Sequence, residues 1–273
     1  ILKIDPKNLS ALNSLGRTYD EKREKLKAEK YYLKALKLNS SSFHVLNNIA
    51  GFYREELNYD KAIKYYQKAL IINPNNAYIY NNLSKIYFDL GNHKEALKNS
   101  IKALQMKKND GDIQKTISFI YLKDHEFKKG WNYFEGRLDL DDYVKKNEYV
   151  QKLNSKLYRF NTINNKKGSF LVVREQGVGD EILYSSMYGD LLNNIENIII
   201  ECDSRLLNLF RRSFPKYAEK FVEIGNITNN NEKFNKIDFV LYAGSLGRYF
   251  RNNIDDFKKD SFINLDKKNV EDM

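Results

Sequence analysis

The sequence is short of cysteine, of long apolar runs and of any leader, and each lack excludes a class of protein. The single cysteine, Cys202, cannot form a disulfide within the chain, which fits a reducing compartment. No apolar run reaches the roughly 18 residues that a membrane helix needs. The opening residues, ILKIDPKN, have neither a charged leader nor an apolar signal segment. We therefore expect a cytoplasmic protein without a membrane span.

Acidic side chains are outnumbered by basic ones, and the net charge is +10. Residues 1–150 carry most of this excess, with 27 basic and 19 acidic side chains. A basic surface attracts nucleic acid, anionic lipid or acidic protein. The lysines are scattered along the chain, however, and no nucleic-acid-binding motif accompanies them. A nucleic-acid partner is therefore not expected.

The first half of the chain repeats with a period of 34 residues. The aligned segments are LSALNSLGRTY (9–19), FHVLNNIAGFY (43–53), AYIYNNLSKIY (77–87) and GDIQKTISFIY (111–121). Position 11 of each unit is tyrosine, position 8 is small, and position 20 is alanine or glycine. Small residues let the two helices of one unit approach closely, and large residues fill the space between units. This pattern resembles the tetratricopeptide repeat.

The register gives repeat units at about 9–42, 43–76, 77–110 and 111–144, with part of an earlier unit at 1–8. Pro74 falls where a proline ends the second helix of a unit. Ile1 falls inside a helix of the preceding unit, and the chain does not begin with methionine. We therefore expect a fragment of a longer protein, with a repeat domain over 1–138.

The resemblance to these repeats implies a superhelix whose concave face is lined by the first helix of each unit. Positions 5 and 6 tend to face that groove, and most of them are asparagine: Asn13, Asn47, Asn48, Asn81 and Asn82. An asparagine amide can donate to a peptide carbonyl and accept from a peptide N–H. The set resembles the asparagine ladder of the O-GlcNAc transferases, which implies a protein or peptide in the groove. The alternative is that asparagine is simply common throughout this chain.

The fourth unit departs from the pattern and has its own resemblance. In FKKGWNYFEGRL (127–138), Gly130, Trp131, Phe134, Glu135 and Arg137 match the last repeat of a bacterial family in which repeats precede a glycosyltransferase-like domain. There, a glycine–tryptophan pair is followed by an aromatic residue, a glutamate and an arginine. Trp131 is expected to seal the end of the array.

The second half, 168–273, follows a polar linker at 139–167 and reads as α/β. Apolar runs predict strands at 169–173, 197–202, 220–225 and 237–244, and helical spacing predicts helices at 180–192 and 204–214. Asp203 or Ser204 is a plausible cap for the second helix. Strands that alternate with helices imply a parallel sheet, which binds ligands at the carboxyl ends of its strands. The loops REQGVGD (174–180) and AGSLGRYF (243–250), the second with Gly244 and Ser245, should therefore meet at one edge.

The loop REQGVGD admits three interpretations. The first is a dinucleotide fingerprint, in which Gly177 and Gly179 hold the phosphates and Glu201 or Asp203 holds the ribose. Ile182 argues against it, because it occupies the place of the third glycine. The second interpretation is structural only, with glycines for positive φ and an aspartate that caps the helix.

The third interpretation is catalytic and comes from a family resemblance. The run REQGVGDEILYSSMYGDLL resembles the first strand–loop–helix of the heptosyltransferase-like (family 9, GT-B) glycosyltransferases. Their Glu-Gln-Gly-x-Gly-Asp motif is matched by Glu175, Gln176, Gly177, Gly179 and Asp180. ECDSRLLNLF and DFVLYAGSLGRYF resemble later elements, although Ala243-Gly244 stands where a proline–leucine pair is usual. The implied fold is a tetratricopeptide superhelix followed by the N-terminal, Rossmann-like half of a GT-B enzyme.

This resemblance implies an inverting sugar transfer in which Asp180 takes a proton from the acceptor hydroxyl. Free N–H groups at the helix start would hold an anionic group of acceptor or donor. The helix N-terminus also lowers a carboxylate pKa, so Asp180 would be a weak base unless burial offsets this effect. The nucleotide-sugar donor would bind mainly in a second domain outside this sequence, and we expect no cofactor and no metal site. The alternative is a non-catalytic repeat scaffold with a degenerate transferase-like domain.

Overall fold

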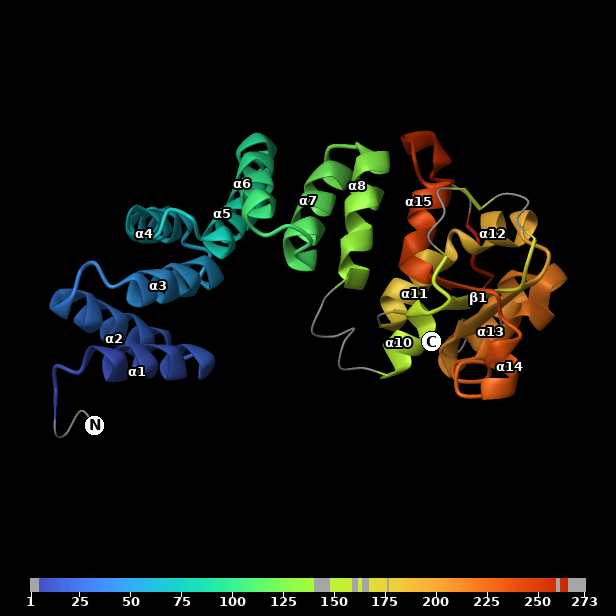
Figure 1. Ribbon diagram of the computed structural model, residues 1–273, viewed down its shortest axis with the longest axis horizontal. Helices are drawn as coiled ribbons and strands as arrows, with labels where there is room; N and C mark the ends of the chain where they lie inside the picture. Colours follow the sequence, from blue (N-terminus) through green and yellow to red (C-terminus); the bar gives the residue numbers. More distant parts are fainter. Residues whose placement is uncertain are drawn as a thin grey trace, which may run out of the picture. The chain divides into compact units, whose positions relative to one another are not determined.

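The computed structural model describes residues 5–139, 148–158, 162–163, 167–175, 177–258 and 261–264. The chain forms two compact units, residues 1–120 and 121–273, and the division falls inside a helix (Figure 1). The predicted domain limits at 138 and 168 therefore stay predictions. None of the described helices is long and apolar enough to cross a membrane.

The first unit consists of antiparallel helix pairs. The pairs are α1 (Leu9–Glu21) with α2 (Lys25–Leu38), α3 (Phe43–Glu55) with α4 (Tyr59–Ile72), and α5 (Ala77–Asp89) with α6 (His93–Met106); α7 (Gly111–Lys123) follows (Figure 1). The first helices begin at residues 9, 43, 77 and 111, which is the predicted 34-residue spacing. Pro74 lies directly after Asn73, the C-cap of α4, as the sequence predicts.

Close helix packing explains the small residues of the repeat. The alanines at positions 20 and 27 of the first three units have no exposed surface: Ala28, Ala62, Ala96, Ala35, Ala69 and Ala103. At position 8, a Cβ added to Gly16 would lie 2.5 Å from the ring of Tyr32, itself buried. The paired helices therefore approach each other more closely than larger side chains allow.

In the first, second and fourth units, the repeated tyrosine at position 11 stacks on a tyrosine of its own unit. Tyr19 stacks on Tyr31 with ring centroids 5.4 Å apart, and Tyr53 stacks on Tyr65 at 5.6 Å. Asparagines at helix N-caps explain part of the asparagine content, since their side chains accept from backbone N–H groups of the first turn: Asn8, Asn58, Asn76 and Asn92.

The second unit begins within α7 and continues with α8 (Phe127–Phe134), the 3₁₀ turn η1 (Glu135–Asp139) and α10 (Glu148–Asn154). Its sheet is parallel, with the order β3-β2-β1-β4. The strands are β1 (Phe170–Val173), β2 (Ile198–Cys202), β3 (Phe221–Glu223) and β4 (Phe239–Tyr242). All four predicted strands are present, each trimmed by one to four residues, and the predicted α/β class is confirmed.

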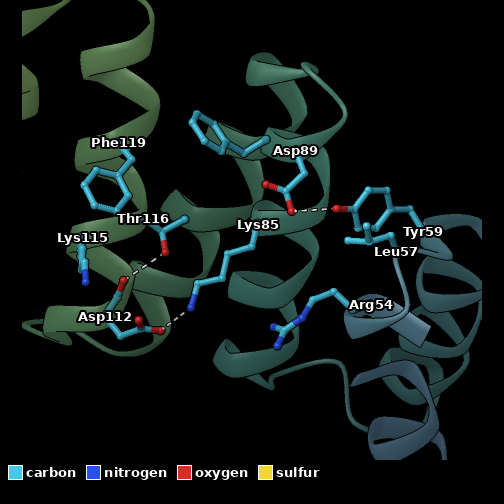
Figure 2. A pocket seen from close by; sticks show the side chains of 10 residues that line it. Arg54, Leu57, Tyr59, Lys85, Asp89, Asp112, Lys115, Thr116 and Phe119 are labelled. Carbon is cyan, nitrogen blue, oxygen red and sulfur yellow. Dashed lines mark hydrogen bonds and ion pairs between the residues drawn. The ribbon is translucent and has the colours of Figure 1, made fainter. Parts of the chain in front are cut away.

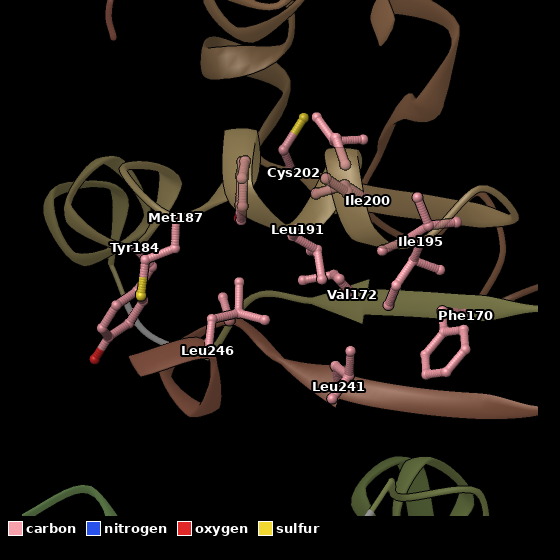
Figure 3. Packing of buried hydrophobic residues seen from close by; sticks show 14 of the residues in the cluster. Phe170, Val172, Tyr184, Met187, Leu191, Ile195, Ile200, Cys202, Leu241 and Leu246 are labelled. Carbon is pink, nitrogen blue, oxygen red and sulfur yellow. The ribbon is translucent and has the colours of Figure 1, made fainter. Parts of the chain in front are cut away.

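Both faces of the sheet are covered, as the continuous apolar run of β1 predicts. Phe170 and Val172 face a core that includes Leu191 of α12 (Tyr188–Asn194) (Figure 3). Phe210 of α13 (Ser204–Ser213) belongs to the same core. Leu171 and Val173 face the opposite side, with Leu153 of α10 and Phe234 of α14 (Asn231–Asn235). The short turns η2 (Pro215–Lys220), η3 (Ala243–Leu246) and η4 (Ile254–Asp256) and the helix α15 (Gly247–Phe250) complete the unit.

The single helix predicted at 180–192 is wrong, because the chain forms two helices there. The first, α11 (Val178–Ser185), ends before Ser186, and α12 begins at Tyr188. The backbone carbonyl of Ser186 accepts a hydrogen bond from the Arg251 guanidinium at 2.7 Å. A contact from 65 residues away thus stabilises the break, and the local helical spacing does not report it.

Two glycines in equivalent helices test the close-packing explanation. Gly51→Ala should raise the free energy of unfolding by about 0.5–1 kcal/mol, because alanine is the better helix former and the added Cβ meets only the Tyr66 hydroxyl at 3.7 Å. Gly16→Ala should lower that free energy, since the Tyr32 ring must move. Urea denaturation measures both. Equal gains in the two variants would show that the Gly16–Tyr32 approach imposes no constraint.

Candidate functional site

A groove in the first unit is lined by three first helices of successive repeats, α3, α5 and α7, together with the turn after α3 and the start of α4 (Figure 2). Its cavity is about 450 Å³. The lining residues are Arg54, Leu57, Tyr59, Lys85, Phe88, Asp89, Asp112, Lys115, Thr116 and Phe119. Leu57 and Phe119 are 70% and 43% exposed, so the groove offers apolar surface beside charged side chains.

The acidic side chains of the groove are engaged inside it. Asp112 accepts from Lys85 at 2.8 Å and from the Asn81 amide at 2.7 Å. Asp89 accepts from the Tyr59 hydroxyl at 3.2 Å (Figure 2). Both aspartates of the groove thus already have hydrogen-bond partners within the protein, whereas some of its basic side chains can still bind a partner.

Two basic side chains keep capacity for a partner. Arg54 donates from Nη1 to the Asn82 amide oxygen at 2.8 Å, and its nearest described carboxylate, Glu55, lies 3.9 Å from Nη2. The Lys115 ammonium lies over the Phe119 ring, 5.7 Å from the centroid. Among the described residues, no carboxylate forms an ion pair with Lys115. The groove is thus apolar at its wall and positive at two points.

The predicted asparagine ladder is used largely to join neighbouring repeats. The Asn48 amide donates to the Asn13 oxygen at 3.1 Å, and Asn82 accepts from a groove arginine. Asn81 is 2% exposed, so it supports a groove aspartate from below and does not face a ligand. Asn47 is half-buried, and no hydrogen bond of its side chain is present among the described residues. In α3 and α5, side chains one or two helical turns further along line the groove, whereas in α7 the residues at positions 5 and 6, Lys115 and Thr116, line it themselves.

At the carboxyl edge of the sheet, the two predicted loops meet. The backbone N–H of Gly244, after β4, donates to Oε2 of Glu175, after β1, at 2.6 Å. A Cβ on Gly244 would lie 2.6 Å from the same oxygen, so only glycine fits there. The expectation that both loops share one edge is confirmed by this contact.

An arginine from the end of the helical segment binds both loops. Arg137, in η1, donates from Nε and Nη2 to the two oxygens of Glu175, each at 2.8 Å, and from Nη2 to Ser245 Oγ at 3.0 Å. Its Nη1 donates to Glu135 Oε1 at 3.0 Å and to the Phe134 carbonyl at 2.9 Å. Burial alone would lower the Arg137 pKa, but the two carboxylates more than offset it, so the pKa is raised.

The other half of the loop is open. Gly177 is the N-cap of α11 with φ −71°, and among the described residues no packing neighbour lies within 4 Å of a Cβ added to Gly177 or Gly179. The proposal that these glycines serve a positive φ is therefore wrong. Asp180 lies in the first turn of α11, half-buried, and is not its cap. Gln176 lies outside the described residues.

Both carboxylates that could have held a ribose are already hydrogen-bonded within the protein. Glu201 is 1% exposed and accepts from the backbone N–H groups of Ile227 and Thr228 at 2.6 and 2.9 Å and from the Thr228 hydroxyl. Asp203 caps α13, as predicted, and accepts from Arg174 and Arg205. These contacts add to the argument against a dinucleotide site.

Comparison with known proteins identifies the helical part. Residues 9–42 and 41–109 match models of the tetratricopeptide repeat. The chain contains tetratricopeptide repeats. The sequence has no match among curated proteins.

The chain is also similar to several solved structures. MamA is 23% identical over 54% of this chain and 85% of its own, with a TM-score of 0.48. YrrB, described as a TPR protein with an unusual peptide-binding site, is 18% identical over 56% of this chain and 77% of its own, with a TM-score of 0.44. The Cut9–Hcn1 assembly matches 56% of this chain and 30% of its own chain at 18% identity and a TM-score of 0.50. This last match shows a shared fold alone.

In the α/β part of the chain, the sequence patterns do not predict one buried carboxylate at the sheet edge, Glu181. Glu181 of α11 is 2% exposed; its Oε1 accepts from the Asp203 backbone N–H at 3.0 Å, and Arg174 Nε lies 3.6 Å from its Oε2. Burial raises the Glu181 pKa, although that N–H and Arg174 act to lower it. Its position four residues after the N-cap Gly177 is typical of an exposed first-turn acid, so the sequence does not indicate that it is buried. No cluster of metal-ligating side chains occurs among the described residues.

The raised pKa of Glu181 predicts a pH-dependent difference between wild type and Glu181→Gln. Below the unfolded value of about 4.5, the carboxyl is protonated in both states and costs nothing. As pH rises through the folded pKa, ionisation in the buried site lowers wild-type stability. The free energy of unfolding of the variant should therefore increase relative to wild type between pH 4.5 and neutrality. A constant difference in urea denaturation at both pH values would contradict this explanation.

Proposed function

We propose that the tetratricopeptide repeats bind an extended segment of a partner protein in the groove between α3, α5 and α7. The observation that carries the proposal is the cavity itself, which combines exposed apolar surface with basic groups (Figure 2). Stacked helix pairs present such concave surfaces to extended ligands. The groove lies in the part of the chain that matches the repeat models, apart from α7.

The charges of the groove define the chemistry of this segment. Asp112 and Asp89 are already hydrogen-bonded, whereas Arg54 and Lys115 have donors to spare. A segment with a carboxylate next to an apolar side chain would pair with these cations and cover Phe119. Opposite charges across an interface raise the association rate and select partners more than they raise affinity.

Substitution of Lys115 and Phe119 should weaken binding of such a segment. Lys115→Ala should reduce affinity for acidic, apolar peptides roughly 3- to 10-fold, and the loss should shrink at high salt because exposed charges are screened. Phe119→Ala should weaken binding at all salt concentrations. Fluorescence anisotropy with peptides selected from an array measures both.

Lys64→Ala is the matched control, since Lys64 is an exposed lysine of α4 outside the groove. Equal affinity of wild type and Lys115→Ala, or an equal loss in Lys64→Ala, would refute the groove as the binding site. Changing Asn47, Asn48, Asn81 and Asn82 to alanine separates this proposal from the asparagine ladder. Loss of stability without loss of peptide specificity would fit their role between repeats.

A second candidate function, for the α/β part, is the acceptor side of sugar transfer from a nucleotide-sugar. Two observations favour it: the open glycines at 177 and 179, which neither the backbone conformation nor packing among described residues requires, and the free N–H groups at the start of α11. The resemblance to heptosyltransferase-like enzymes assigns the base to Asp180. The donor would bind mainly in a further domain.

Asp180→Asn should abolish sugar transfer by the natural full-length protein while its fold persists. Loss of the general base is expected to cost about 10²–10⁴ in rate, measured as transfer or donor hydrolysis with a panel of nucleotide sugars. Asp255→Asn, an exposed aspartate outside the loop, is the matched control. Full-length protein that binds no nucleotide sugar, while its repeats still capture a peptide, would support the non-catalytic scaffold instead.

A further inference from the structure

The crevice of this sheet lies between β1 and β4. From β1 the chain continues to β2 and β3 on one side, and β4 then returns to the other side of β1. The loops after β1 and β4 therefore diverge at this point, where open parallel sheets bind ligands. In this chain the Arg137–Glu175 pair lies between these loops, with side chains 9% and 10% exposed.

We propose that Arg137 is a positioning residue, which sets the geometry of both loops for a ligand bound at the open glycines. This inference rests on the proposed ligand site at the carboxyl edge. Arg137 itself cannot hold the ligand, because each of its five N–H groups already has an acceptor. Arg137 acts through the loops, because it is hydrogen-bonded to Glu175 in the loop after β1 and to Ser245 in the loop after β4.

In this proposal Glu175 likewise positions the loop and does not contact the ligand. One of its oxygens accepts from Arg137 Nε, and the other accepts from Arg137 Nη2 and from the Gly244 N–H. A carboxylate with these three charge-assisted or short bonds is held in one orientation. The glutamate of the loop motif thus fixes where the loop begins, two residues before Gly177.

A second contact holds the same helical segment against the loop after β4. The Trp131 indole N–H donates to the Arg251 carbonyl at 2.6 Å, and a Cβ on Gly247 would lie 2.6 Å from the Trp131 ring. The predicted role of Trp131 at the array end is thereby specified: it packs on the α/β part. The segment α8–η1, Phe127–Asp139, therefore contacts the loop after β4 near its start, through Arg137, and near its end, through Trp131.

Backbone hydrogen exchange separates positioning from general stabilisation. Arg137→Lys keeps the charge but loses the planar fork, so the Gly244 N–H should exchange roughly tenfold faster or more. The amides of Leu171 and Val172, in the middle of β1, should keep wild-type protection. Glu175→Gln should give a smaller change, since its amide oxygen still accepts from Gly244.

Arg205→Lys is the matched control, because Arg205 also forms a fork with a carboxylate, Asp203, but is 72% exposed. Unchanged exchange at Gly244 in Arg137→Lys, or a loss of equal size at Gly244 and Leu171, would overturn the proposal.

Titration with inorganic phosphate, followed by the amide shifts of Gly177 and Gly179, tests the site on which the proposal rests. Weaker phosphate binding in Arg137→Lys than in wild type and in Arg205→Lys supports positioning, and equal binding in all three overturns it. If phosphate leaves the wild-type shifts unchanged, the proposed ligand site fails, and the exchange of Gly244 still decides whether Arg137 orders the loop.

Discussion

The bidentate pair between Arg137 and Glu175 is the contact on which the carboxyl edge of the sheet depends. Removing one member of a buried ion pair typically costs about 3–5 kcal/mol, because the other charge is left without a partner. Here the loss of Glu175 would also leave the Gly244 N–H without its acceptor, and the loss of Arg137 would leave Ser245 Oγ without this donor. One guanidinium from the helical segment thus joins two loops that lie 69 residues apart in the chain, and Gly244 is glycine because the pair leaves no room for a Cβ.

In the repeats, the governing constraint is the close approach of paired helices. Fully buried alanines at positions 20 and 27 allow it, and side chains at positions 5 and 6 then fall between successive first helices. They become bridges there, as in the bond between Asn13 and Asn48. In α3 and α5 the groove-lining residues lie further along the helix, as Arg54 and Lys85 do, whereas in α7 Lys115 and Thr116 stand at positions 5 and 6. Four of the predicted groove asparagines thus bond between repeats, and the side chains that line the groove are others.

The sequence predicts those features of the fold that depend on neighbouring residues in the chain. The 34-residue period, the four strands and the Asp203 cap all depend on residues close in sequence. The site depends on distant partners, and these escape such patterns. The break between α11 and α12 is stabilised by Arg251, and the burial of Glu181 follows from the start of α13 lying above it. A family resemblance singles out Arg137 in the sequence, but only the fold shows that it is hydrogen-bonded to both loops at the sheet edge.

The Glu-Gln-Gly-x-Gly-Asp loop divides into two parts with different explanations. Its glutamate is accounted for by structure, because both oxygens are hydrogen-bonded inside the protein. Its glycines are not, since each has a helical or extended backbone, and no described residue fills the space where a side chain would be. A position that tolerates a Cβ sterically, lies beside a helix N-terminus and still carries glycine points to something outside the chain that approaches the backbone. The glutamate alone would fit a degenerate scaffold, whereas the open glycines beside Asp180 are the part of the loop that supports the proposed ligand site.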